Sequence, residues 1–202
     1  MSTTTKGTRP EELSSAPVLS LYSTAQATAE AMRAALASPR VPLATARPDE
    51  RPGVYVLFAR RTTPGLRRYG AVITTGAFPL YIGSAQLLPR RLNRHRQTVA
   101  SAHGLKVDDL AVLFIYTDAL AAALAVEALL IREVRPPWNE RALSGFGSAP
   151  QVGERRPRAS GFDCLHPRSW ARPASHDDGV TARAALRLYL ASGYVRALWP
   201  AL

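Results

Sequence analysis

The chain has 202 residues, 47% of them hydrophobic, which suits one globular core with terminal arms and leaves little room for two full domains. A formal net charge of +11 attracts phosphate polymers or anionic membranes. Only Lys6 and Lys106 are lysines, and the remaining basic residues are arginines, whose planar fork binds phosphate or guanine through paired hydrogen bonds. The charge therefore favours a nucleic-acid partner. Codon bias is the alternative explanation, because the chain is also rich in Ala, Pro and Gly.

Several protein classes are disfavoured. No apolar run is long enough to cross a bilayer, and the polar residues 1–15 lack the apolar segment of an export signal, so we expect a cytoplasmic protein without a membrane partner. The lone Cys164 excludes an internal disulfide framework. A zinc site on Cys164 and His166 is a weak alternative, because these two ligands lack partners at standard spacing.

The chain divides into an N-terminal arm and helix (1–50), a core (51–142) and a C-terminal Arg/Gly-rich segment with a helix (143–202). Apolar spacing predicts helices at 16–38, 87–102, 117–134 and 181–191, and strands at 53–59, 69–74, 79–83 and 110–116. Thr117-Asp118 is the expected cap of the third helix, which Pro136-Pro137 ends. This order predicts an α+β fold with a small antiparallel or mixed sheet of three to four strands, flanked by helices.

Two tyrosines, Tyr55 and Tyr81, occupy the same relative place in two strands that we expect to pair antiparallel. Cross-strand neighbours on one face lie about 5 Å apart, so the two phenols can share one shallow pocket. Ordinary strand propensity is the alternative explanation, since tyrosine is favoured in strands.

Arg91 and His95 lie four residues apart on the second predicted helix and therefore on one face, at the rim of its apolar side. An arginine there can hold a phosphate and offset developing charge, and a histidine can relay a proton near neutral pH. A solvated basic face is the alternative. We expect only non-specific phosphate contact from the neighbouring Arg90, Arg94 and Arg96.

Glu127 is the only residue in 119–131 that is not Ala, Leu, Val or Ile. A helix that is apolar all round is buried, and a buried carboxylate without a partner is very costly. Mg²⁺, the guanidinium of Arg91 or both can offset that cost, and a structural ion pair with an arginine is the alternative. Asn139, directly after Pro136-Pro137-Trp138, can brace the turn, support the site or contact phosphate.

These motifs together resemble the GIY-YIG nuclease superfamily: Gly53-Val54-Tyr55, Tyr81-Ile82-Gly83, the Arg-x-x-x-His helix, the lone helical glutamate and Pro-x-x-Asn occur in its order between residues 53 and 139. Downstream, Gly145-Phe146-Gly147 and the Leu-His-Pro-Arg-Ser-Trp run at 165–170 resemble its type II restriction endonuclease branch, members of which cut the palindrome CCGCGG. The chain departs in Val54, in a long spacing between the two tyrosines, and in a short loop at 84–89.

The resemblance implies that the active site consists of Tyr55, Tyr81, Arg91, His95, Glu127 and Asn139. It implies one-metal hydrolysis of double-stranded DNA at a short GC-rich palindrome, with Mg²⁺ (or Mn²⁺ as a substitute) held by Glu127. Tyr55 would act as general base with His95 taking up the proton, Arg91 would neutralise charge, and Tyr81 and Asn139 would orient groups.

Cutting both strands implies a C2 homodimer, and a restriction enzyme implies a cognate DNA methyltransferase in the host. Guanine is read best by arginine, and the candidate readers are Arg67, Arg68, Arg155, Arg156 and Arg158. Two alternatives stay open: a structure-specific or homing-type GIY-YIG nuclease, and a non-catalytic arginine-rich DNA-binding module.

Overall fold

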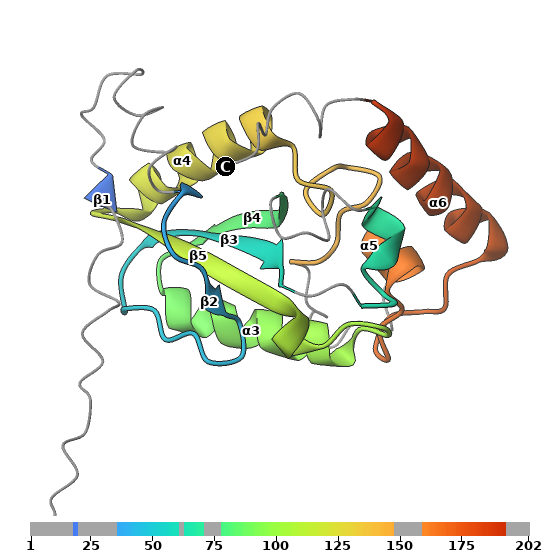
Figure 1. Cartoon of the computed structure of the whole chain (residues 1–202), viewed down its shortest axis with the longest axis horizontal. Helices are drawn as coiled ribbons and strands as arrows, with labels where there is room; N and C mark the ends of the chain where they lie inside the picture. Colours follow the sequence, from blue (N-terminus) through green and yellow to red (C-terminus); the bar gives the residue numbers. More distant parts are fainter. Residues whose placement is uncertain (1–17, 20–35, 61–62, 71–77, 148–158, 193–202) are drawn as a thin grey trace, which may run out of the picture.

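One sheet organises the part of the chain that the structure, a computed structural model, describes: residues 18–19, 36–60, 63–70, 78–147 and 159–192 (Figure 1). Its centre is three antiparallel strands, β3 (Gly53–Ala59), β4 (Pro79–Ala85) and β5 (Leu110–Thr117), with β3 in the middle and β4 at one edge. The predicted α+β class and its small sheet are confirmed. Two-residue strands, β1 (Val18–Leu19) and β2 (Val41–Pro42), both pair with β5 and bring the number of strands to five.

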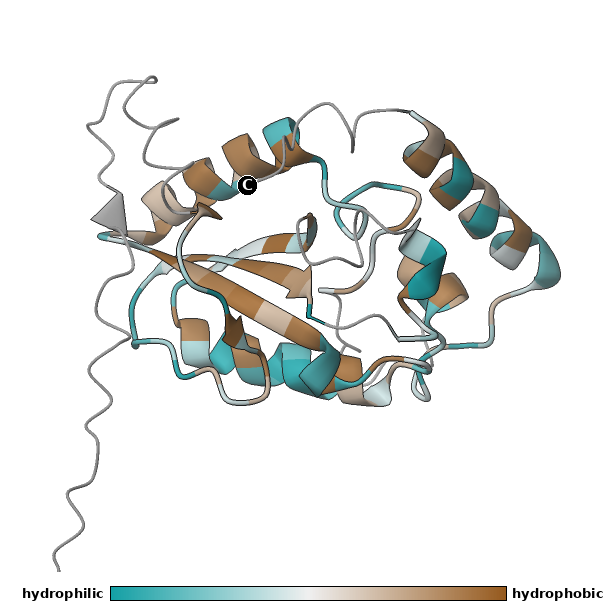
Figure 2. Cartoon of the chain, viewed as in Figure 1, coloured by the Kyte–Doolittle hydropathy of each residue, from teal (hydrophilic) through white to brown (hydrophobic). Residues whose placement is uncertain are grey.

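Helices cover both faces of this sheet, α3 (Leu88–Ser101) on one side and α4 (Leu120–Val134) on the other (Figure 1). Every residue of β3 and β5 is therefore buried, which explains why both strands are almost continuously apolar in sequence. Figure 2 shows the same contrast, with hydrophobic central strands and many hydrophilic residues on α3. The predicted bounds of all five of these elements agree with the structure to within three residues.

Two predictions about α4 are wrong. Its N-cap is Ala119 rather than Thr117-Asp118, because the Thr117 hydroxyl donates to the Ala119 carbonyl oxygen at 3.0 Å. The helix is also not buried all round: Leu120 and Leu124 are 36% and 51% exposed. The helix ends as predicted before Pro136-Pro137, with Arg135 in the left-handed region at φ 49°.

The prediction of a helix over 16–38 is wrong at Val18–Leu19, which pair in parallel with Tyr116 and Thr117 of β5. Sheet pairing there overrides the local helical spacing, and residues 20–35 of that prediction lie outside the described residues. The strand predicted at 69–74 is wrong at Tyr69, which ends the 3-10 helix η1 (Arg67–Tyr69). Residues 71–74 of that prediction also lie outside the described part.

The C-terminal third contains α5 (Gly161–Leu165), which was not predicted, and α6 (His176–Ala191), which begins five residues before the predicted start. Both helices start at capping boxes, Ser160 with Asp163 and Ser175 with Asp178. A second 3-10 helix, η2 (Val107–Asp109), precedes β5. Among the described helices, none combines the length and apolarity that a membrane crossing requires. The division into three segments stays a prediction.

Candidate active site

Tyr55 on β3 and Tyr81 on β4 lie on one face of the sheet. Contrary to the prediction, they are not direct cross-strand partners. Tyr55 pairs with Gly83, and Tyr81 pairs with Leu57, so the two tyrosines are diagonal neighbours. Their ring centroids are 6.1 Å apart. Diagonal pairs remain within reach of aromatic side chains, which explains why the two rings still lie close together.

The Tyr55 hydroxyl is the meeting point of the residues from α3. It lies 2.6 Å from His95 Nε2, and it accepts a hydrogen bond from Arg91 Nε at 3.2 Å. His95 and Tyr55 are almost completely buried, whereas Arg91 is half-buried and so reaches from the buried cluster toward the surface. Four of the six predicted residues, namely Tyr55, Tyr81, Arg91 and His95, therefore form one cluster between β3, β4 and α3.

Burial sets the protonation of this cluster. Burial and the nearby charges of Arg91 and Arg94 lower the pKa of His95 to about 3, so the imidazole is neutral at pH 7. Burial, followed by the proximity of Tyr81, raises the pKa of Tyr55 although Arg91 opposes this, so Tyr55 is a neutral phenol. Burial acts to lower the pKa of Arg91, but the two tyrosines outweigh it and raise the pKa above its ordinary value. At rest, the cluster therefore contains one permanent positive charge, on Arg91, beside the neutral side chains of Tyr55 and His95.

Gly83 is required by the position of the Tyr55 ring. A Cβ atom at Gly83 would lie 2.2 Å from the Tyr55 hydroxyl oxygen, 2.5 Å from Tyr55 Cζ and 2.9 Å from Tyr81 Cε1. Real Cβ atoms do not approach other heavy atoms this closely, so any larger residue displaces the phenol from Arg91 and His95. The glycine of the Tyr-Ile-Gly motif thus makes the space in which the cluster forms.

The loop Gly145-Phe146-Gly147 completes the cluster, although its residues were not among those predicted for the site. Phe146 stacks on His95, with centroids 4.8 Å apart and planes inclined by 9°, and it meets Tyr81 edge-on at 5.0 Å. A Cβ at Gly147 would lie 2.7 Å from the Tyr81 hydroxyl and 3.1 Å from a terminal nitrogen of Arg91. This loop therefore forms part of the low-polarity wall that keeps His95 neutral.

The loop is held by the segment that follows it. Arg168, only 4% exposed, donates to the Gly145 carbonyl at 3.1 Å and forms a two-pronged ion pair with Asp163 at 2.5 and 3.0 Å. The guanidinium of Arg168 and the Ser160 capping bonds lower the pKa of Asp163 despite its burial. The arginine of the Leu-His-Pro-Arg-Ser-Trp run is therefore structural, and it anchors the loop that packs on His95.

Glu127 reaches the site from the opposite helix, α4. It is half-buried rather than buried as predicted, and its carboxylate accepts a hydrogen bond from the Ser84 hydroxyl of β4 at 2.5 Å. Within the described residues, no ion pair joins Glu127 to Arg91, whose Nε donates to Tyr55. Its charge contributes to raising the pKa of Tyr81, behind the larger effect of burial, so the carboxylate lies within electrostatic reach of the cluster.

The surroundings of Glu127 fit one hard divalent cation that keeps most of its water. Mg²⁺ in such sites is held by one or two carboxylates together with substrate phosphate oxygens. The carboxylate is accessible and hydrogen-bonded only to a neutral hydroxyl in the described part of the chain, so it retains free lone pairs. No group of three or more His, Cys, Asp or Glu residues occurs among the described residues, which disfavours a closed all-protein site.

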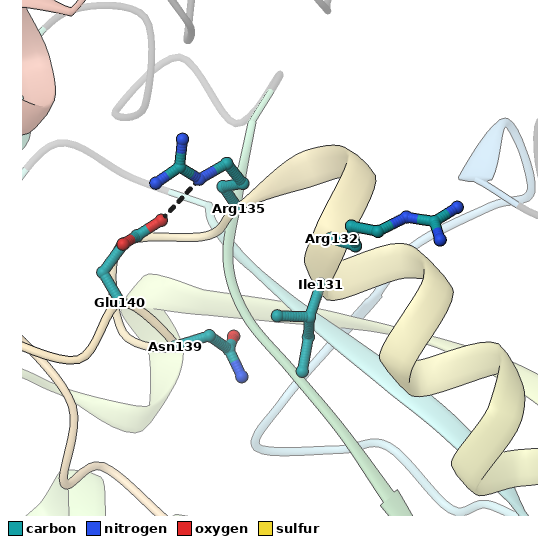
Figure 3. Close-up of a pocket in the computed structure, with 5 residues that line it drawn as sticks. All are labelled: Ile131, Arg132, Arg135, Asn139 and Glu140. Atoms are coloured by element: carbon teal, nitrogen blue, oxygen red, sulfur yellow. Dashed lines mark hydrogen bonds and ion pairs between the residues drawn. The ribbon is translucent and has the colours of Figure 1, made fainter.

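Asn139 braces the edge strand. Its side-chain amide accepts from the Ile82 N–H at 2.8 Å and donates to the Ile82 carbonyl at 2.9 Å. The Trp138 N–H also donates to the Leu80 carbonyl at 3.0 Å, so this turn covers the open edge of β4 beside Tyr81. Asn139 also lines a cavity of about 500 Å³ with Glu140 and with residues at the end of α4, Ile131, Arg132 and Arg135 (Figure 3).

A second tyrosine–histidine pair lies behind the first. The Tyr69 hydroxyl is 2.8 Å from His166 Nε2 and accepts from Trp138 Nε1 at 2.8 Å. All three side chains are buried, and burial lowers the pKa of His166 to about 3. The pair fastens η1 to the C-terminal segment. With Nε2 of His166 engaged and no third ligand beside Cys164 in the described residues, the zinc alternative has no support.

The arrangement of these parts defines the class. Gly-Val-Tyr and Tyr-Ile-Gly occupy adjacent antiparallel strands, with the Arg/His helix on one face and the glutamate helix on the other, which is the GIY-YIG type of nuclease domain. A family model of the Eco29kI GIY-YIG domain matches residues 83–186, more than half of the chain. The chain belongs to this family of restriction endonucleases and is a DNA-hydrolysing nuclease.

Comparisons with individual proteins give little further information about this chain. No curated protein sequence matches the chain. Among solved structures, the GIY-YIG N-terminal endonuclease domain of UvrC from Thermotoga maritima, bound to its catalytic magnesium, is 26% identical. That similarity covers 45% of this chain and 85% of the UvrC domain, with a TM-score of 0.31.

Proposed function

We propose that the chain is a type II restriction endonuclease that hydrolyses phosphodiester bonds of double-stranded DNA at a short GC-rich palindrome. The convergence of Arg91 and His95 on the hydroxyl of Tyr55 carries this proposal. A buried phenol linked to a neutral imidazole, with a guanidinium at its open side, can bind a phosphate and move a proton. The membership in a restriction endonuclease family supports sequence specificity over the structure-specific or homing-type alternative.

The proton moves through Tyr55 in our proposal. Because the resting phenol is protonated, it can accept a proton from the attacking water only by giving its own proton to His95 Nε2, 2.6 Å away. This requires the His95 tautomer with the hydrogen on Nδ1, an atom that has no hydrogen-bond partner among the described residues. The negative charge of a bound phosphate favours the imidazolium that results, because it opposes the effect of Arg91.

The remaining residues position the phosphate and neutralise its charge. Arg91 binds the scissile phosphate and offsets charge as the pentavalent state forms. Glu127 would hold one Mg²⁺, with Mn²⁺ as a substitute, and the ion would supply electrostatic stabilisation of the phosphate and of the leaving 3′ oxygen. Tyr81 orients the phosphate beside Arg91, and Asn139 keeps β4 in register by holding Ile82.

The partners follow from the reaction. One cluster cuts one strand, so we propose that two chains related by a two-fold axis act on a palindrome in the cytoplasm, where a cognate methyltransferase protects host DNA. Among the candidate base readers, Arg67 is exposed, and Arg68 is tethered to the Leu165 carbonyl. The candidates Arg155, Arg156 and Arg158 lie outside the described residues.

The test is digestion of a sequenced plasmid with Mg²⁺, followed by run-off sequencing of the ends. Discrete ends at one palindrome are expected, and scattered or branch-dependent ends would favour the structure-specific alternative. Glu127→Ala should abolish cleavage and leave DNA binding in EDTA largely unchanged, since the carboxylate acts through the metal. Metal-independent binding without cleavage by the wild-type chain would instead favour a non-catalytic DNA-binding module.

A further inference from the structure

A second arginine pair lies on the other flank of α3, away from the Tyr55 cluster. Arg96 and Arg47 line a cavity of about 480 Å³ together with Asn93, and its other walls are Ala44, Ala46, Pro48 and Pro89. None of the lining residues is acidic. The two guanidiniums are close enough that Arg47, after the larger effect of burial, contributes to lowering the pKa of Arg96. Like charges held together without an acid need an anion to offset them.

Arg96 is fixed in place before any ligand arrives. Its Nε donates to the Leu43 carbonyl at 2.9 Å, and its two terminal nitrogens donate to Asn93 Oδ1 at 2.6 Å and to the Ala46 carbonyl at 2.5 Å. Three of the five N–H groups of a guanidinium are thereby used, which leaves two for a ligand. Arg47 donates to the Ala46 carbonyl at 3.0 Å and is otherwise exposed, so its remaining N–H groups face the cavity mouth or solvent.

The start of α3 adds to the positive field. Pro89 belongs to the first turn, the N-cap Leu87 makes no side-chain cap, and no acidic residue occurs in the first turn. No acidic side chain of the first turn of α3 therefore offsets the positive end of the helix dipole, and the same helix carries several arginines, an arrangement that an anion stabilises.

The geometry of α3 relates this cavity to the cleavage cluster. Arg91 and Arg96 are five residues apart, which places them about 140° apart around the helix, on opposite rims of its buried side. Arg90 and Arg94 project between them over the outer face, where they line a separate cavity of about 380 Å³ with Arg91. A duplex that crosses the outer face of α3 from the Tyr55 cluster would pass Arg90 and Arg94 before it reaches Arg96.

We propose that Arg47 and Arg96 form a second phosphate-binding site, which holds a DNA backbone phosphate away from the scissile bond and sets the course of the duplex across α3. This inference rests on the proposed function, because it takes DNA as the ligand. A contact of this kind is independent of sequence, so it contributes equally to cognate and random duplexes.

The test compares charge reversals at two exposed arginines. Arg47→Glu places a carboxylate beside Arg96 and fills the site, whereas Arg187→Glu makes the same charge change on α6, outside the cavity. Binding of a short GC-rich duplex in EDTA is measured by fluorescence anisotropy between about 50 and 200 mM salt. Arg47→Glu should weaken binding by at least about tenfold more than Arg187→Glu, and should lower the salt slope by about 0.9 per lost phosphate contact. Arg47→Ala serves as a milder variant that leaves the anchors of Arg96 intact.

Three results would overturn the inference. Equal losses of DNA affinity for Arg47→Glu and Arg187→Glu would mean that binding depends only on the net charge of the chain. Thermal stabilisation by inorganic phosphate that Arg47→Glu abolishes, without a change in DNA affinity, would assign the cavity to a free anion. Failure of the wild-type chain to bind any duplex would refute the proposed function and this inference with it, whereas the first two results leave the proposed function intact.

Discussion

The change Gly83→Ala tests whether the position of the Tyr55 phenol is what the active cluster depends on. The new methyl group would lie 2.2 Å from the Tyr55 hydroxyl oxygen, where an ordinary contact is about 3.5 Å, so the ring has to move by about 1 Å. Tyr81, 2.9 Å from the same methyl group, closes one direction of escape. Movement of that size lengthens the 2.6 Å contact with His95 beyond hydrogen-bond range, and misplacement by about 1 Å costs roughly 100-fold in rate.

The assay is single-turnover plasmid cleavage with Mg²⁺, alongside thermal unfolding and DNA binding in EDTA. We expect a cleavage loss of about 100-fold with DNA binding nearly unchanged, because Arg91 stays in place. Gly179→Ala in α6 is the matched control, since its methyl group meets only the flexible end of Arg183, at 3.4 Å or more. If Gly83→Ala cleaves at the wild-type rate, or loses activity only in proportion to lost folding, the relay through Tyr55 is refuted.

Three further predictions concern the buried histidines and their neighbours. Phe146→Leu admits water beside His95, so its pKa should rise above about 3, which NMR titration of the imidazole would detect. Below about pH 6.5, His95 and His166 bind protons in the unfolded state but remain neutral in the folded state. As the pH falls from about 6 to 4.5, the free energy of unfolding should therefore decrease by about 1.4 kcal/mol per pH unit for each histidine. Urea midpoints that stay flat over this range would contradict both assignments. Tyr69→Phe leaves Trp138 Nε1 and His166 without their partner and should destabilise the fold by about 1–3 kcal/mol in urea unfolding.

The sheet and its two flanking helices were predictable because their local patterns coincide with their burial. β3 and β5 are buried on both faces, so their sequences are apolar without interruption, and α3 shows one apolar stripe beside an arginine-rich surface. The tyrosines and the Arg91/His95 pair follow from the same patterns, since strand and helix periods fix which side chains share a face. The starts of α5 and α6 were also readable, as Ser-x-x-Asp spacings at 160–163 and 175–178.

The part of the site that was not predicted from the sequence, the loop around Phe146, depends on long-range contacts. Phe146 stacks on His95 from a loop whose Gly145 carbonyl is held by Arg168, and Arg168 is in turn held by Asp163. None of these pairings has a local period, and the segment reads as irregular for that reason. The glycines on both sides of Phe146 were the available signal, because a Cβ at either would collide with Ser160 or Tyr81.

Glu127 was singled out by a prediction of burial that the structure contradicts. Its burial was the reason to expect a partner, yet the carboxylate is half-buried and bonded to Ser84. Side chains alternate along a strand, so β4 directs Tyr81 toward α3 and Ser84 toward α4. Groups on opposite faces of a sheet can serve one reaction only around an edge, and β4 is an edge strand. Asn139 and Trp138 cover that edge as far as Ile82, so a phosphate that is to contact both Arg91 and a metal on Glu127 has to approach beyond Ile82, at Gly83 and Ser84.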